Sequence, residues 1–209
     1  MDNQKQNQVK SSILLWLECL ILFFFCPFII YIFRHIIAFR VVPILMVLGP
    51  LVYLSLKRDI TFNSRIFFRA DGMRSHFKAM TWILMFGIPV LTACTWLWIP
   101  EHFFRFPKER TGLWLIVMVF YPFLAALPQE IIFRCFFFHR YQRILTTPGV
   151  MIMFNGLSFG LFHLFYNNWF APVLSTLGGC LFAWRYQKSN SLPVVTLEHA
   201  LWGNILFTI

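Results

Sequence analysis

Three short segments late in the chain carry ionisable side chains among apolar neighbours. They contain Glu130 and Arg134, then His163, then His199 with Asn204. A carboxylate can take a proton from water, and a nearby imidazole can orient that water. Imidazole and amide donors can stabilise the oxyanion of a tetrahedral intermediate. These residue types therefore predict a hydrolytic site made by Glu130, His163, His199 and Asn204.

The first segment reads Pro128-Gln129-Glu130 and ends at Arg134. Glu130 and Arg134 are four residues apart, so on a helix they share one face and can neutralise each other. A buried ion pair that only fixes the helices is an equally open interpretation of this segment. The pair alone therefore does not establish a catalytic role.

The second segment ends at His163, on the far side of a turn at Thr147. Glu130 lies 17 residues before Thr147, and His163 lies 16 residues after it. In an antiparallel helical hairpin both residues would lie about 24 Å from the turn. We therefore expect the carboxylate and the imidazole at the same depth.

The third segment places His199 eight residues beyond Ser191, and Asn204 five residues beyond His199. Five residues correspond to about 140° around a regular helix. Both side chains can serve one site only if Gly203 permits a local distortion. The alternative for Asn204 is a hydrogen bond between helices, a common use of amides in membranes.

Zinc is a possible cofactor, although none is required by this chemistry. Glu130, His163 and His199 are residue types that could hold a zinc ion, and their spacing leaves this open. There is no HExxH motif. The five cysteines all lie in apolar stretches without a CxxC pair, which indicates small core residues.

The composition indicates the elements that must position these residues. Hydrophobic residues make up 59% of the chain and charged residues only 12%, against roughly a quarter in soluble domains. We therefore expect an all-α, polytopic transmembrane helical bundle of about seven helices. The expected spans are 13–33, 41–56, 80–99, 113–138, 149–166, 171–184 and 192–209.

Residues 57–79 differ from the spans because six Lys and Arg residues alternate there with phenylalanines. The mixture is typical of an amphipathic helix at a membrane surface, and a basic cytoplasmic loop explains it equally well. We expect one membrane domain in two parts. Residues 1–112 form the N-terminal transmembrane helices with this basic segment, and 113–209 carry the candidate site.

The loop charges predict the orientation. With seven spans, twelve Lys and Arg lie on the side of the N-terminus and five on the other, while Arg134 lies inside a span. The positive-inside rule then places the N-terminus in the cytoplasm. The basic residues lie in loops between spans, so membrane topology explains the net charge of +10 without nucleic acid as a partner. Membrane lipids are the expected partners.

The ordered set of segments resembles the CPBP family, which includes type II CAAX prenyl endopeptidases and bacterial proteins linked to bacteriocin processing and immunity. The family pattern is EExxxR, then FxxxH, then HxxxN. The matching residues are Gln129-Glu130 with Arg134, Phe159 with His163, and His199 with Asn204. The resemblance covers about 113–209, roughly half the chain.

This resemblance implies an intramembrane endopeptidase that cleaves a membrane-associated or lipidated peptide, in a bacterial cytoplasmic membrane. In the family, the first acid and the FxxxH histidine activate water, and the last histidine and asparagine stabilise the oxyanion. By the match, Gln129, Arg134 and Phe159 would support the site. Both glutamate-type and metal-dependent mechanisms have been assigned to the family.

The chain departs from the family pattern at two places. Gln129 stands at the first acid, and glutamine cannot act as a general base. The asparagine is one residue later than in HxxxN. Either Glu130 takes over the role of the base, or the chain is an inactive pseudoprotease or an immunity-type binding protein. A proton-coupled carrier is a third possibility, which the absence of an internal repeat disfavours.

Overall fold

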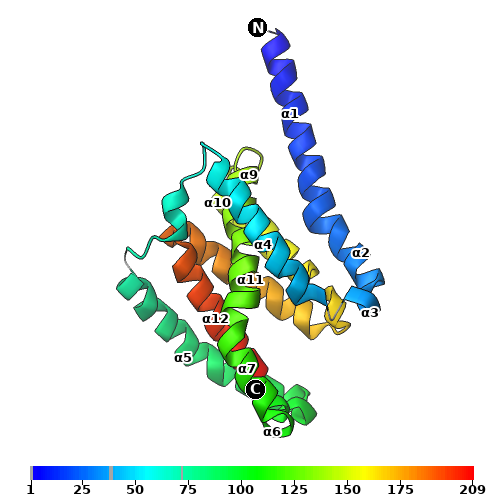
Figure 1. The fold of residues 1–209 in the computed structure, drawn as a ribbon, viewed down its shortest axis with the longest axis vertical. Coiled ribbons are helices and arrows are strands. Elements are labelled where there is room, and N and C mark those ends of the chain that lie inside the picture. The colour runs from blue at the N-terminus through cyan, green and yellow to red at the C-terminus, as the bar shows by residue number, and fades with distance from the viewer. Residues whose placement is uncertain (1, 38–39, 72) are drawn as a thin grey trace.

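The computed structural model describes residues 2–37, 40–71 and 73–209, and all secondary structure in these ranges is helical. Figure 1 shows an all-α bundle of long helices with the N-terminus at one end and the C-terminus towards the other. The fold class predicted from composition is therefore confirmed.

Each of the seven expected spans corresponds to helical structure. Five stretches of the described chain are long and apolar enough to cross a membrane: Lys10–Ile32, Val41–Arg58, Met73–Trp98, Thr111–Tyr141 and Pro148–Tyr166. The two remaining spans are α11 (Phe170–Ser189) and α12 (Leu192–Thr208), which fall outside that criterion. The helix α12 has 17 residues and is shorter than the 18 that the criterion requires, whereas α11 has 20 residues and includes polar residues such as Arg185 and Lys188, which lower its hydropathy.

The first three spans are α1 (Asp2–Leu20), continued by η1 (Ile21–Phe25) and α2 (Cys26–Ile32), then α4 (Val41–Arg58) and α5 (Met73–Trp98). The helix α3 (Arg34–Ile37) follows the first span, and two short helices follow the third, namely η4 (Pro100–His102) and α6 (Arg105–Glu109).

The basic segment 57–79 is divided between three elements. The helix α4 ends at Arg58, a short 3-10 helix η3 covers Ser64–Phe67, and α5 begins at Met73. A continuous amphipathic helix is therefore not observed there. Phe62 and Phe67 are nevertheless buried in the core, so the segment packs against the bundle.

The fourth span runs through the middle of the bundle in Figure 1, between the other long helices. It comprises α7 (Thr111–Tyr121), η5 (Pro122–Ala126), α8 (Leu127–Glu130), η6 (Ile131–Phe136) and α9 (Phe137–Tyr141). Residues of η6 enter both hydrophobic clusters of the core. Ile131 packs with residues of α11 and α12, and Phe133 packs with residues of α1, η1 and α10.

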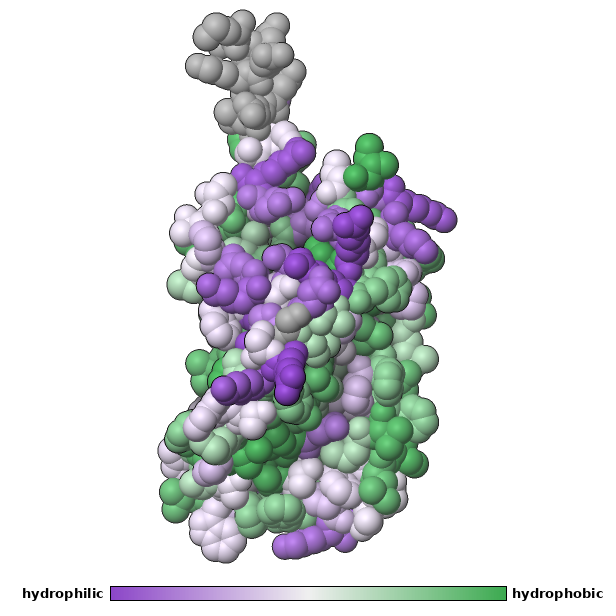
Figure 2. All heavy atoms as spheres, turned by 90° about the vertical axis from the view of Figure 1, so that its left-hand side faces the viewer, coloured by the Kyte–Doolittle hydropathy of each residue, from purple (hydrophilic) through white to green (hydrophobic). Residues whose placement is uncertain are grey.

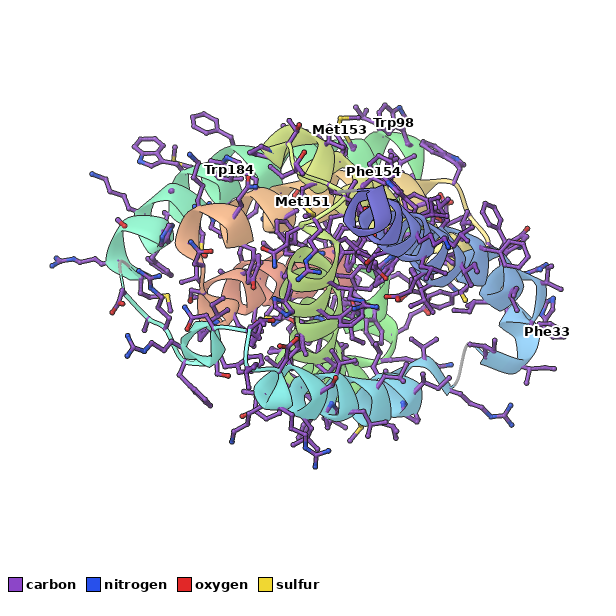
Figure 3. The ribbon with its side chains drawn as sticks, turned by 90° about the horizontal axis from the view of Figure 1, so that it is seen from above. Phe33, Trp98, Met151, Met153, Phe154 and Trp184 are labelled. Atoms are coloured by element: carbon purple, nitrogen blue, oxygen red, sulfur yellow. The ribbon has the colours of Figure 1, made fainter. Side chains whose placement is uncertain are left out.

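The fifth span, α10 (Pro148–Leu161), is followed by η7 (Leu164–Tyr166) and lies against α11. Glycines allow this approach, because a Cβ at Gly156 would lie 2.2 Å from Cys180 Sγ and one at Gly160 would lie 1.9 Å from Thr176 Oγ1. Small residues of this kind let helix backbones pack closely in membranes. On its other side, α10 contacts α1, and Figure 3 shows Phe154 lying towards that N-terminal helix.

The outer surface separates by polarity. In the face drawn in Figure 2, hydrophilic residues gather in the half nearer the N-terminus, and apolar residues cover much of the other half. Large apolar side chains such as Trp82, Phe86 and Trp98 are exposed. Such a surface suits contact with lipid, because a soluble monomer rarely exposes large apolar patches.

Candidate active site

Glu130 occupies the centre of the candidate site, at the junction between α8 and η6. Its side chain is completely buried. Oε1 lies 2.7 Å from Nδ1 of His199, and Oε2 lies 3.0 Å from Nε of Arg134. Both carboxylate oxygens therefore face protein groups, and this arrangement favours Glu130 as the partner of His199.

The backbone around Glu130 departs from regular α-helix on both sides. The π-helical turns η5 and η6 flank the single α-helical turn α8. Pro122 begins η5 and Pro128 lies inside α8, and neither can donate a backbone hydrogen bond. Wide turns of this kind are frequent at functional sites. They set the rotation that turns Glu130 towards α12 and Arg134 towards α10.

Arg134 is held by a second buried residue, Asn155 of α10. Nη1 of Arg134 donates to Oδ1 of Asn155 over 2.8 Å, and Nδ2 of Asn155 donates to the carbonyl of Phe133 over 2.6 Å. Both side chains are fully buried. Sequence reasoning missed Asn155, although a lone amide in an apolar span is a signal for such a role.

The ring of Phe159 of α10 packs against the guanidinium of Arg134 and against both histidines. The guanidinium of Arg134 lies 5.0 Å from the centroid of its ring. The ring of His163 lies 4.8 Å away on centroids and that of His199 lies 5.4 Å away. Phe159 therefore explains the apolar member of the FxxxH pattern, because both imidazoles pack on one aromatic ring.

The two histidines each keep one ring nitrogen without a protein partner among the described residues. Nδ1 of His163 lies 2.8 Å from the carbonyl of Phe159, so this nitrogen carries the proton and donates. Nδ1 of His199 faces the carboxylate of Glu130 and donates in the same way when that group is ionised. Nε2 is therefore the available acceptor on both rings.

Asn204 lies away from the imidazole of His199. The helix α12 is regular throughout Leu192–Thr208, so five residues turn Asn204 to another face. Its Nδ2 donates to the carbonyl of Met118 over 3.1 Å. The interhelical hydrogen bond, which the sequence left open for this residue, is the arrangement observed.

Gln129 adjoins Glu130 and has no hydrogen-bond partner for its buried Oε1 atom among the described residues. This residue stands where the resembling family carries its first acid. Its carbonyl oxygen can accept a hydrogen bond from water but cannot take a proton at neutral pH.

A second buried ion pair lies beside the site, between α11 and α12. Arg185 donates to both oxygens of Glu198, over 2.7 Å and 2.9 Å. Arg185 is one of the twelve basic residues placed on the side of the N-terminus, and its placement in a loop was wrong because it lies in α11 with a side chain only 2% exposed. Without Arg185, eleven basic residues remain on the side of the N-terminus, against five on the other. The direction of the imbalance is unchanged.

The arrangement does not fit a zinc site. Within the described ranges, no three His, Cys, Asp or Glu side chains are grouped to hold a metal ion. Glu130, the carboxylate in contact with His199, is paired with a guanidinium cation that would oppose a second positive charge.

A polar cluster of another kind lies outside the spans, where Asp59 follows α4. Its carboxylate accepts from the hydroxyl of Thr61 over 2.7 Å and faces Nε2 of His139 at 2.9 Å. These hydrogen bonds, that of Thr61 first, hold the pKa of Asp59 below its usual range. Thr61 and His139 border a cleft of about 500 Å³, distinct from the candidate site.

Comparison with known proteins supports the resemblance over the C-terminal part of the chain. Residues 111–205 match the family model described as type II CAAX prenyl endopeptidase, Rce1-like. No curated protein and no solved structure gives a significant match. The ordered motifs therefore pointed to the same family as the model that matches this region, and the long apolar helices support an integral membrane protein.

Proposed function

We propose, on the premise that residues 111–205 belong to the Rce1-like type II CAAX prenyl endopeptidase family, that the chain is an intramembrane endopeptidase. Its substrate is a membrane-associated or lipidated peptide. The observation that carries the proposal is the 2.7 Å contact between Glu130 and Nδ1 of His199, which leaves Nε2 of His199 free. The imidazoles of His199 and His163 both pack on the ring of Phe159.

In the proposed reaction, Nε2 of His199 removes a proton from water while the water oxygen attacks the peptide carbonyl carbon. The carboxylate of Glu130 stabilises the imidazolium that forms, as a carboxylate does in a hydrolytic triad. The tetrahedral intermediate then expels the amine, which takes the proton from Nε2 as the C–N bond breaks. Nε2 of His163 accepts the second hydrogen of the water and orients it. Glu130 is thus a positioning residue.

The reaction as proposed uses only side chains of this chain and no metal ion. General-base catalysis by a positioned side chain contributes about 10²- to 10⁴-fold. The remaining rate enhancement would come from orientation of the peptide and stabilisation of the oxyanion. A chelator such as 1,10-phenanthroline should therefore leave cleavage unchanged.

The location of the site suggests how the substrate reaches it. Glu130 and His199 lie within the helical bundle, among helices whose outer faces suit lipid. A peptide that is itself anchored in the membrane can reach such a site from the bilayer. We propose a bacterial cytoplasmic membrane with the N-terminus in the cytoplasm, as the excess of basic loop residues favours.

The test is cleavage by the full chain in proteoliposomes, against a panel of prenylated and unprenylated C-terminal peptides. We expect His199→Ala to lower the rate of cleavage at least 100-fold, and His163→Ala to lower it at least tenfold. His102→Ala is the matched control, because His102 is exposed and remote from the site. A rate for His199→Ala equal to wild type would contradict the proposed base.

Gln129 favours a second candidate function, that of a pseudoprotease that binds a peptide without cleaving it. Its amide stands where the family pattern has an acid, and Glu130 is already occupied by two partners. For this candidate, wild type should bind peptides of the panel without cleaving any, and Gln129→Glu should create cleavage. Cleavage of any peptide of the panel by wild type would exclude this candidate.

A further inference from the structure

The face of α12 that carries His199 continues one turn further at Gly203. The family pattern HxxxN has its amide four residues beyond the histidine, which is the position of Gly203 in this chain. Asn204 lies one residue later and donates its amide to the carbonyl of Met118. The site therefore lacks an amide donor on the face of His199.

Tyr121 fills the space that a side chain at position 203 would need. A Cβ at Gly203 would lie 2.2 Å from Cε1 of Tyr121 and 2.4 Å from its hydroxyl oxygen. No Cβ approaches another atom that closely, so a side chain at position 203 would require the ring of Tyr121 to move. The hydroxyl of Tyr121 thus occupies the region in which an amide on α12 would otherwise project.

The ring of Tyr121 also faces the site. It lies edge-on to the imidazole of His199, with ring centroids 6.0 Å apart, and contacts Phe207 on the same helix at 5.1 Å. These contacts fix the ring at the end of α7, where η5 begins. Its hydroxyl has no hydrogen-bond partner among the described residues, so it is a donor positioned without a protein acceptor.

We propose that the hydroxyl of Tyr121 donates the hydrogen bond that stabilises the oxyanion, in the role that the family pattern gives to an amide four residues after the histidine. The inference rests on the proposed endopeptidase function and names a further catalytic residue for it. A hydroxyl and an amide N–H both donate to a developing oxyanion, and a tyrosine has only two side-chain torsions to fix. No covalent step involves Tyr121.

The first test is Tyr121→Phe in the full chain, assayed in proteoliposomes with a peptide that wild type cleaves. Removal of one oxyanion donor lowers kcat by about 10²- to 10³-fold in hydrolases. We expect a loss of kcat of at least tenfold with KM within about twofold of wild type and an unchanged unfolding midpoint. Tyr53→Phe is the control, because Tyr53 packs on Phe67 in another part of the bundle.

The second test exchanges the two side chains. Gly203→Asn alone should abolish activity, because its Cβ collides with Tyr121. Tyr121→Ala alone should lose the donor. The double variant Tyr121→Ala with Gly203→Asn restores both the space and a donor, and we expect kcat at least tenfold above that of Tyr121→Ala.

Two outcomes separate the failure of this inference from the failure of the proposed function. A wild-type chain that cleaves while Tyr121→Phe keeps the full kcat overturns the role of Tyr121 and leaves the endopeptidase intact. A wild-type chain that cleaves no peptide of the panel, under conditions where a family member is active, overturns the endopeptidase and this inference together.

Discussion

At the residue scale, the site is a connected set of polar groups inside an apolar bundle. Glu130 contacts both Arg134 and His199, and Arg134 in turn donates to Asn155. A charged group in a spanning helix is costly unless it has a partner or faces water. Each member therefore needs its neighbours, and a change at one residue should propagate to the others.

We expect Arg134→Leu to lower the free energy of unfolding by about 3–5 kcal/mol, because removal of one partner leaves the other charge buried. Glu130 would remain buried with only a histidine contact, and Oδ1 of Asn155 would lose its donor. The midpoint of denaturation in detergent, followed by helical circular dichroism, measures the loss. Cleavage should fall as well, because Glu130 positions His199.

The matched control is Arg105→Leu, which removes a pair of the same spacing from an exposed helix. Arg105 and Glu109 lie 2.9 Å apart with side chains 53% and 56% exposed. Exposed pairs of this kind contribute about 0–1 kcal/mol. Equal losses for Arg105→Leu and Arg134→Leu would show that the buried network does not stabilise the bundle.

At the element scale, the position of the histidines depends on how α10 lies against α11 and α12. Phe159 and His163 belong to α10 and the residues just after it, and Gly156 and Gly160 bring that helix close to α11. The π-helical turns around α8 then rotate Glu130 towards His199. A displacement of α10 should therefore separate the imidazoles from the carboxylate.

Gly160→Ala tests this dependence. The added Cβ would lie 2.7 Å from the backbone carbonyl of Pro172 and 1.9 Å from Thr176 Oγ1, so the helices must move apart. Overpacking of this kind costs about 1–3 kcal/mol. We expect a lower denaturation midpoint and weaker cleavage, because Phe159 and His163 flank the substituted position.

Gly149→Ala on the same helix serves as the control, since its Cβ would meet nothing within 4 Å. Alanine is favoured over glycine inside a helix by up to about 1 kcal/mol, so this variant should be as stable as wild type or more stable. A Gly160→Ala variant that behaved like Gly149→Ala would contradict the close packing of α10 on α11.

At the scale of the whole molecule, the helices alternate in direction, and the hydrophilic groups gather towards the end of the N-terminus (Figures 1 and 2). The arrangement connects three features on one side of the membrane: the N-terminal helix, the basic segment between α4 and α5, and the turn between α9 and α10. Glu18 of α1 accepts two hydrogen bonds from Arg140 of α9, at 2.9 Å and 2.7 Å. The basic segment meets α9 through Asp59 and His139.

The orientation can be measured by labelling single cysteines with a membrane-impermeant thiol reagent in intact cells. In a background with the five native cysteines replaced, we expect Lys108→Cys to react from outside. Asn63→Cys should react only after permeabilisation, because it lies on the basic side. Both residues are exposed. The reverse labelling pattern would place the basic loops outside, against the positive-inside rule.

The positions of the spans, and the presence of candidate site residues in the late helices, could be predicted from the sequence because both depend on local properties. A run of about 20 apolar residues has to cross the bilayer whatever its neighbours are. An ionisable residue within such a run is a functional candidate by its cost alone. Glu130, His163 and His199 could therefore be named as candidates from the sequence, and the all-α bundle could be predicted from it.

Which polar groups meet was decided only by the tertiary structure. The rotation of each helix and the distance between helices determine that Arg185 pairs with Glu198, that Asn155 supports Arg134, and that Tyr121 takes the space at Gly203. These contacts join residues far apart in sequence, and the π-helical turns around Glu130 shift its direction from that of a regular helix. Residue spacing fixes a face only within one uninterrupted helix, so pairings between helices required the packed bundle.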